Sequence, residues 1–196
     1  MSRMILSMFM SIDGYVENPD GSLIRPEWSD DLEQHWSRPN VAPGSLLLYG
    51  RRAFEQNAPL WPAMAADPKN SEGFRALART MNELPKVVVS RTLESADWNA
   101  TISPGPLATT VRELNSRFSG DIIAVGGVTL AAGLLAADLV DEYRLLVLPR
   151  LAGGGHSLFK EPHGAIGLEL RDVLKMDTGA VRLTYARKQP GAADSP

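Results

Sequence analysis

Residues 121–148 have the sequence DIIAVGGVTLAAGLLAADLVDEYRLLVL: an apolar run, two glycines, a stretch rich in alanine and leucine, and a second apolar run. The first run stops at Gly126-Gly127, where the chain can turn sharply, and the alanine-rich stretch has the composition of a helix. The second run, Glu142 to Leu148, predicts another strand. A strand, a helix and a strand in this order predict a βαβ unit, and therefore a parallel sheet covered on both faces.

The same alternation continues on both sides of this unit. Further apolar strands are predicted at Met4 to Met10, Ser45 to Tyr49 and Lys86 to Val89. A first helix is predicted from an N-cap at Ser29 to just before Pro39, and a second begins at Arg51. A third lies around Phe74, Leu77 and Met81, within residues 59–85, which depart from the main alternation of strands and helices. A fourth runs from Leu107 to Phe118, with Gly120 as C-cap. An antiparallel hairpin is predicted near the end of the chain, from Leu168 and Leu170, the turn Asp177-Thr178-Gly179, and the alternating Val181, Leu183 and Tyr185. The sheet is therefore predicted to be mixed but mostly parallel.

The length of 196 residues suits one domain, which we place at residues 1–188. Residues 189–196 lack large apolar side chains, and a disordered tail is expected there.

Composition excludes several kinds of chemistry. The chain has no cysteine, which rules out disulfides and thiolate metal centres, and its three histidines do not have metal-ligand spacing. The net charge is -3 with scattered basic residues, so no nucleic-acid partner is expected. Met4 to Met10 is too short for an export signal, and no run approaches the ~20 apolar residues of a membrane span. We therefore expect a cytoplasmic protein that does not enter a membrane.

Two strand ends carry residues that suit a phosphate. Gly50, Arg51 and Arg52 follow one strand, and a helix start there supplies free N–H groups, a positive dipole end and two guanidinium groups. Gly126, Gly127, Val128 and Thr129 follow another strand and would let a pyrophosphate approach the backbone. The alternatives are a capped helix with solvated arginines and a tight strand-to-helix turn.

A third strand end is followed by Ser90, Arg91 and Thr92, two hydroxyls around one guanidinium. Such donors suit a phosphate monoester, whereas sites for NADH tend to carry an acid on the ribose hydroxyls. If this loop meets the adenosine end of a dinucleotide, it would select the 2′-phosphate of NADPH. The alternative is an ordinary polar loop.

The substrate end is predicted at the first strand. Ser11, Asp13 and Gly14 could border the nicotinamide and the substrate, with Asp13 as hydrogen-bond acceptor or proton relay. Further candidates for binding an amidine-like heterocycle are Asp30, Asp31 and Glu33. The alternatives are an Asp-Gly turn and first-turn acids that only complement a helix dipole.

Five motifs, taken in order, resemble the dihydrofolate-reductase-like family, which includes the reductase domain of the bifunctional riboflavin-pathway enzyme. They are Ser11-Ile12-Asp13-Gly14, Tyr49 to Glu55, Val89 to Leu93, Val125-Gly126-Gly127 and Leu139 to Tyr143. The resemblance covers nearly the whole chain. It implies a three-layer α/β/α fold, NADPH as hydride donor, a pterin or ribosylaminopyrimidine substrate and a homodimer. It also implies that Gly50, Arg51, Arg52 and Gly126 to Leu130 hold the diphosphate, and Ser90, Arg91 and Thr92 the 2′-phosphate.

The chain departs from the family pattern in two places. Ala53 stands where many relatives have a threonine, and Asn57 to Pro62 lacks the Asp-Pro pattern of riboflavin-pathway reductases. The leading hypothesis is an NADPH-dependent reductase of a small nitrogen heterocycle. The alternatives are a non-catalytic nucleotide- or antifolate-binding module with the same fold and a flavodoxin-like FMN carrier.

Overall fold

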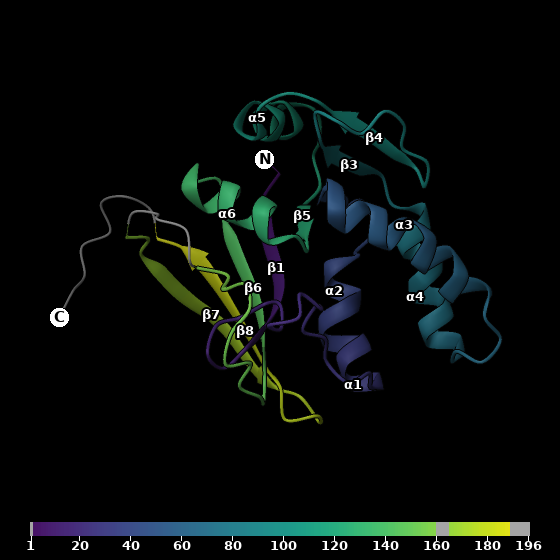
Figure 1. Ribbon diagram of the computed structural model, residues 1–196, viewed down its shortest axis with the longest axis vertical. Helices are drawn as coiled ribbons and strands as arrows, with labels where there is room; N and C mark the ends of the chain where they lie inside the picture. Colours follow the sequence, from purple (N-terminus) through teal and green to yellow (C-terminus); the bar gives the residue numbers. More distant parts are fainter. Residues whose placement is uncertain (1, 160–164, 189–196) are drawn as a thin grey trace.

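The computed structural model describes residues 2–159 and 165–188, so the tail predicted at residues 189–196 lies outside the described residues. An eight-stranded sheet in the order β4-β3-β2-β5-β1-β6-β8-β7 forms its middle layer (Figure 1). The strands are β1 Met4–Ser11, β2 Leu46–Gly50, β3 Lys86–Val89, β4 Ala100–Ser103, β5 Ile122–Val125, β6 Glu142–Leu148, β7 Leu168–Lys175 and β8 Val181–Arg187. All pairings from β4 to β6 are parallel, and β8 runs antiparallel to both β6 and β7. The predicted mixed, mostly parallel sheet and its closing hairpin are confirmed.

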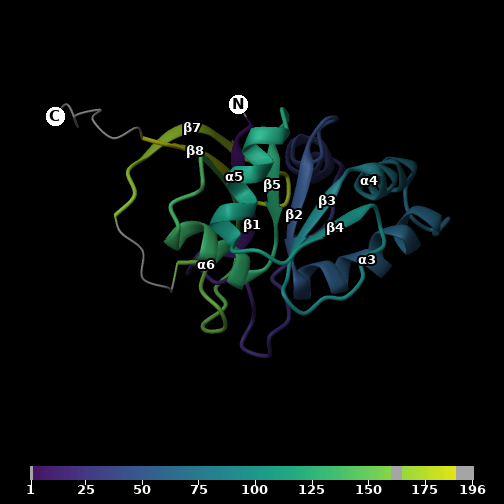
Figure 2. The same ribbon diagram turned by 90° about the horizontal axis from the view of Figure 1, so that it is seen from above.

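Helices cover both faces of the sheet. One face packs against α5 Leu107–Arg117 and α6 Val128–Ala136, through alternate β1 residues such as Met4 and Leu6. The other face packs against α3 Arg51–Ala66 and α4 Glu72–Glu83, with Ile5 of β1 on that side. In Figure 2, α3 and α4 lie beside the part of the sheet that carries β3 and β4, while α5 and α6 lie by β1 and β5. The sequence therefore builds three layers, with β1 buried between them.

The first helix differs from its prediction because it does not end before Pro39. It runs as α1 Asp30–Leu32, a π-helical segment η1 Glu33–Ser37 and α2 Arg38–Asn40. Proline has no N–H to donate to the carbonyl four residues back. Here that carbonyl, His35 O, accepts from Arg182 Nη1 of β8 instead. A bond from a distant strand thus lets the helix continue through Pro39.

Two further expectations need correction. The helix that starts at Arg51 continues to Ala66 through Pro59 and Pro62, so the first part of the predicted excursion belongs to α3. Gly120 is not a C-cap: α5 ends at Arg117, and a Cβ on Gly120 would lie 1.8 Å from the Gly44 carbonyl oxygen. That glycine is required by close backbone packing, which a sequence pattern does not reveal.

Within residues 2–159 and 165–188, no helix combines the length and the apolar character needed to cross a membrane. Over the same residues, no three acidic or histidine side chains gather as metal ligands.

Candidate functional site

The four strands that carry the predicted motifs are neighbours in the sheet. β3, β2, β5 and β1 lie side by side in this order and are parallel, so their carboxyl ends share one edge. Neighbouring strands are about 4.8 Å apart, so the loops after β3 and β1 are separated by about 14 Å across the strands. β1 also runs on to Ser11, beyond Ser7, its last pair with β5. We call this edge of the sheet the carboxyl edge, formed by residues 11–14, 50–52, 90–92 and 126–130.

A crevice is built into the carboxyl edge by the chain topology. After β2 the chain enters α3 on one face of the sheet, and after the adjacent β5 it enters α6 on the opposite face. Adjacent strands whose helices leave to opposite faces open a crevice, which is where ligands bind in open α/β sheets.

The start of α3 is electropositive without an acid in its first turn. The N-cap residue is Gly50, which has no side chain to accept a hydrogen bond from the first N–H groups of the helix. Arg51 and Arg52 are the first two helical residues, and both are exposed. Cations are disfavoured at the positive end of a helix dipole, which together with free N–H groups attracts anions. The arrangement suits a bound anion such as a phosphate.

The glycine pair after β5 faces this helix start. Gly126 and Gly127 have φ values of 70° and 90°, which favour glycine, and Gly127 is the N-cap of α6. A Cβ on Gly127 would lie 3.6 Å from the Ala53 Cβ, and one on Gly50 would lie 3.6 Å from the Leu130 Cβ. The starts of α3 and α6 therefore lie against each other, and buried Ala53 is the side chain between them.

The loop after β3 is joined to the same place. Arg51 Nη1 donates to Thr92 Oγ1 at 2.7 Å. The Ser90 hydroxyl accepts from the Thr92 and Leu93 N–H groups at 3.2 and 3.0 Å, and these two bonds leave its own O–H available as a donor. Arg91 is exposed. The structure thus brings three of the predicted motifs together, with Arg51 as the side chain that bridges two of them.

At the fourth position of the edge, the predicted substrate residues hold the loops in place. Ser11 is buried, and its hydroxyl accepts from the Tyr15 N–H at 3.0 Å. The Asp13 carboxylate accepts from the Ala152 and Gly153 N–H groups at 3.0 and 2.8 Å. Hydrogen bonding by the Ser11 side chain, and then by these two N–H groups, lowers the pKa of Asp13 to about 2. Asp13 is therefore ionised at neutral pH, where it can accept a proton but has none to donate.

Residues 150–158, which follow β6, are attached to the loop after β1. Leu158 N donates to Gly14 O at 3.0 Å, and Val16 N donates to His156 O at 2.9 Å. Gly14 has a φ of 85°, so its turn favours glycine. Beside these bonds Ile12 and Leu151 are 62% and 71% exposed, which places apolar surface where a flat ring could pack.

Asp30 lies in a hollow that the sequence did not locate. The hollow has a volume of about 680 Å³ and lies between the first helix and the start of α4, lined by Asp30, Glu33, Gln34, Arg38, Ser71 and Gly73. Glu33 is 5% exposed, and its Oε1 pairs with Arg38 Nη2 at 2.8 Å. Ser71 and Gly73 were missed because no sequence pattern places the start of α4 beside the first helix.

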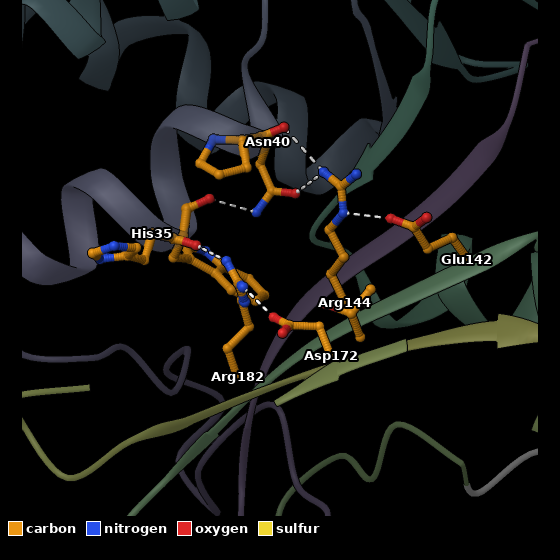
Figure 3. Close-up of a pocket in the computed structure, with 9 residues that line it drawn as sticks. His35, Asn40, Glu142, Arg144, Asp172 and Arg182 are labelled. Carbon is orange, nitrogen blue, oxygen red and sulfur yellow. Dashed lines mark hydrogen bonds and ion pairs between the residues drawn. The ribbon is translucent and has the colours of Figure 1, made fainter. Parts of the chain in front are cut away.

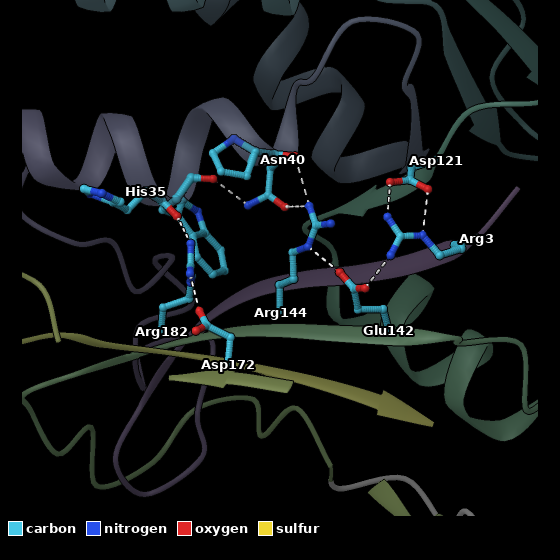
Figure 4. A network of polar contacts seen from close by, with 10 residues as sticks. Arg3, His35, Asn40, Asp121, Glu142, Arg144, Asp172 and Arg182 are labelled. Carbon is cyan, nitrogen blue, oxygen red and sulfur yellow. Dashed lines mark hydrogen bonds and ion pairs between the residues drawn. The ribbon is translucent and has the colours of Figure 1, made fainter. Parts of the chain in front are cut away.

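A second cavity, of about 230 Å³, lies between the first helix and the face of β6, β8 and β7 (Figure 3). Its charged groups are paired: Arg144 Nε contacts Glu142 Oε1 at 2.7 Å, and Arg182 pairs with Asp172. Glu142 also accepts from Arg3, which pairs with Asp121 (Figure 4). Because Glu142 is the first residue of β6, this network lies away from the carboxyl edge and joins the first helix to the sheet.

Comparisons with known proteins agree with this architecture. A model of the RibD C-terminal domain matches residues 3–181. The uncharacterized protein YyaP of Bacillus subtilis (strain 168) is 26% identical over 189 residues, covering 93% of this chain and 94% of that protein.

Solved structures share the fold. A putative riboflavin biosynthesis protein from Shewanella sp. PV-4 superposes with a TM-score of 0.70 at 20% identity, covering 96% of this chain and all (100%) of the other. Dihydrofolate reductase from Enterococcus faecalis, solved with NADP(H), gives a TM-score of 0.63 at 13% identity, covering 95% and 97% of the two chains.

Proposed function

Because this chain belongs to the RibD C-terminal domain family, we propose that it is an NADPH-dependent reductase that transfers hydride to a small nitrogen heterocycle of the pterin or ribosylaminopyrimidine type. The structural neighbours share the dihydrofolate-reductase-like fold, and one of them, from Enterococcus faecalis, is a dihydrofolate reductase. One observation carries the proposal: two helix starts and a hydroxyl-bearing loop converge on a crevice in which Arg51 and Arg52 have no acid in the first turn of their helix.

Residues along the carboxyl edge fit successive parts of such a cofactor. Gly50, Arg51 and Arg52 at α3, with residues 126–130 at α6, would hold the diphosphate through N–H groups and guanidinium charge. Ser90, Arg91 and Thr92 would bind the 2′-phosphate, and Ser90 also shapes their loop through its bonds with the Thr92 and Leu93 N–H groups. The nicotinamide would then face the loop of Ser11, Asp13 and Gly14. When bound, NADPH supplies the hydride.

The protein's own part is positional. Asp13 holds the loop after β6 against the loop after β1, and the exposed Ile12 and Leu151 provide apolar surface for a planar substrate. Asp30, at the rim of the hollow beside the first helix, would accept hydrogen bonds from an amino-substituted ring. Alignment of donor and acceptor and exclusion of water are then the main contributions to rate.

Titration of the purified protein with NADPH and with NADH, followed by a panel of pterins and aminopyrimidines monitored by loss of reduced cofactor, tests the proposal. Binding of NADPH with steady consumption would support it, and failure to bind either dinucleotide would refute it.

Binding of NADPH without turnover of any substrate would identify the second candidate, a non-catalytic nucleotide- or antifolate-binding module. The observation that favours this candidate is that the Asp13 carboxylate accepts hydrogen bonds from the Ala152 and Gly153 N–H groups, so it serves to hold two loops together.

We also propose that the chain forms a homodimer. Leu170 and Val173 are 51% and 55% exposed on β7, the outermost strand of the sheet, and would be covered in a pair. Sedimentation analysis of the purified protein would test this, since a monomer at micromolar concentration would contradict it.

A further inference from the structure

Arg51 has two partners at the point where the residues proposed for the diphosphate meet the loop proposed for the 2′-phosphate. Its Nη1 donates to Thr92 Oγ1 at 2.7 Å, and its Nε pairs with Glu55 Oε1, also at 2.7 Å, one helical turn further along α3. The Arg51 and Glu55 side chains are 47% and 43% exposed, so both are within reach of a ligand that lies along the carboxyl edge. We infer that Glu55 is a cofactor-specificity residue that reduces the preference of this protein for NADPH over NADH.

The pairing contributes little to the stability of the helix itself. A cation in the first turn with an acid four residues later is the less favourable orientation of such a pair with respect to the helix dipole. An exposed ion pair of this kind contributes little to stability. The pairing does have an electrostatic consequence for a ligand, because it neutralises the guanidinium that links α3 to Thr92.

A 2′-phosphate placed at Thr92 would compete with Glu55 for Arg51. The guanidinium has five N–H donors, and the carboxylate holds the one on Nε while Nη1 points to Thr92. A phosphate at Nη1 would therefore share one positive charge with a fixed negative one. The resulting repulsion between exposed groups is expected to cost about fivefold in affinity.

NADH has no phosphate at this position, and its ribose carries two hydroxyl groups. Carboxylates accept hydrogen bonds from these hydroxyls in NADH-binding sites, so Glu55 would be neutral or favourable for NADH. One acid on α3 therefore acts in opposite directions on the two cofactors. Arg91 and Thr92 favour NADPH over NADH, and Glu55 reduces this selectivity to a moderate preference.

This inference rests on the proposed function, and Glu55→Gln tests it because glutamine keeps the shape and removes the charge. Dissociation constants of NADPH and NADH would be measured by calorimetry at low ionic strength, where exposed charges are least screened. The variant should bind NADPH about fivefold more tightly and NADH no more tightly than the parent does. Glu72→Gln is the matched control, since Glu72 is an exposed helical acid that pairs with Arg75 and Arg79 on α4. Its ratio of the two constants should equal that of the parent.

The failures are distinguishable. If the parent binds NADPH but Glu55→Gln leaves the ratio of the two constants unchanged or shifts it toward NADH, the role of Glu55 is refuted and the proposed function stands. If the control shifts the ratio as much as Glu55→Gln does, the effect is one of net charge and the role is again refuted. If the parent binds neither dinucleotide, the proposed function is refuted and this inference with it.

Discussion

Gly155 lies where the loop after β6 crosses the loop after β1, and Gly155→Ala tests how tight that crossing is. A Cβ at this position would lie 2.0 Å from the Glu17 carbonyl oxygen and 2.8 Å from its carbonyl carbon, at a φ of 106° that L side chains rarely adopt. The atoms contacted belong to the backbone, so the two loops must separate. Overpacking and backbone strain each cost about 1–3 kcal/mol, and the free energy of unfolding should therefore fall by about 2–6 kcal/mol.

Two neighbouring glycines provide matched controls. A Cβ on Gly154 would meet Pro19 Cγ at 3.4 Å, an ordinary contact, and Gly154→Ala should have little effect. Gly153 has a φ of 69° with nothing within 4 Å of the added Cβ, so Gly153→Ala should cost only the strain of about 1–2 kcal/mol. Urea unfolding followed by circular dichroism would rank the three variants. A loss for Gly155→Ala no greater than that for Gly153→Ala would refute the close crossing of the loops.

The remaining predictions concern the cofactor and the pH dependence of stability. Arg91→Ala should weaken NADPH binding by about 1.5–3 kcal/mol, the contribution of a hydrogen bond to a charged group, with NADH binding barely changed; equal losses in the two titrations would contradict this role. Arg52→Glu should raise the free energy of unfolding by about 0.3–1 kcal/mol, since an acid suits the start of α3, and should abolish NADPH binding; lower stability in urea would contradict the argument from the helix dipole. Burial lowers the pKa of Lys86 from 10.5 to about 8, so between these values the unfolded chain holds a proton that the folded chain has lost. Stability should therefore rise with pH over this range, and Lys86→Met should remove that contribution; equal slopes for the parent and the variant in urea unfolding would contradict it.

The sequence predicted the sheet well because its central strands are apolar runs, and two of them, β2 and β5, are also marked by glycines at their ends. Residues 121–148 form β5, α6 and β6 as expected, and the strand Glu142 to Leu148 has the predicted bounds. The short strand Ala100–Ser103 was missed because it lies at the edge of the sheet and is only half buried, so its four residues carry no alternation strong enough to detect. Edge strands lose the pattern that burial imposes on central ones.

The first helix illustrates what a local pattern cannot contain. Pro39 marks a helix end in most sequences, and it failed to do so here because Arg182, far along the chain, supplies the hydrogen bond that proline lacks. This substitution depends on which strands become neighbours of the helix, and no residue type signals it.

The candidate site combines two features with different origins. The crevice follows from topology, because α3 and α6 leave adjacent strands toward opposite faces, and many sequences of this fold would produce it. The charge does not follow from topology, because Arg51 and Arg52 occupy the helix start where local energetics favour acids. Local disagreement of this kind between a residue and its position is expected where a binding function overrides stability. A ligand anion that neutralises the start of α3 removes the disagreement. Among the described residues Arg52 pairs with no acid, whereas Arg144 and Arg182 of the second cavity are both paired, which is the reason to place the phosphates of the cofactor at α3.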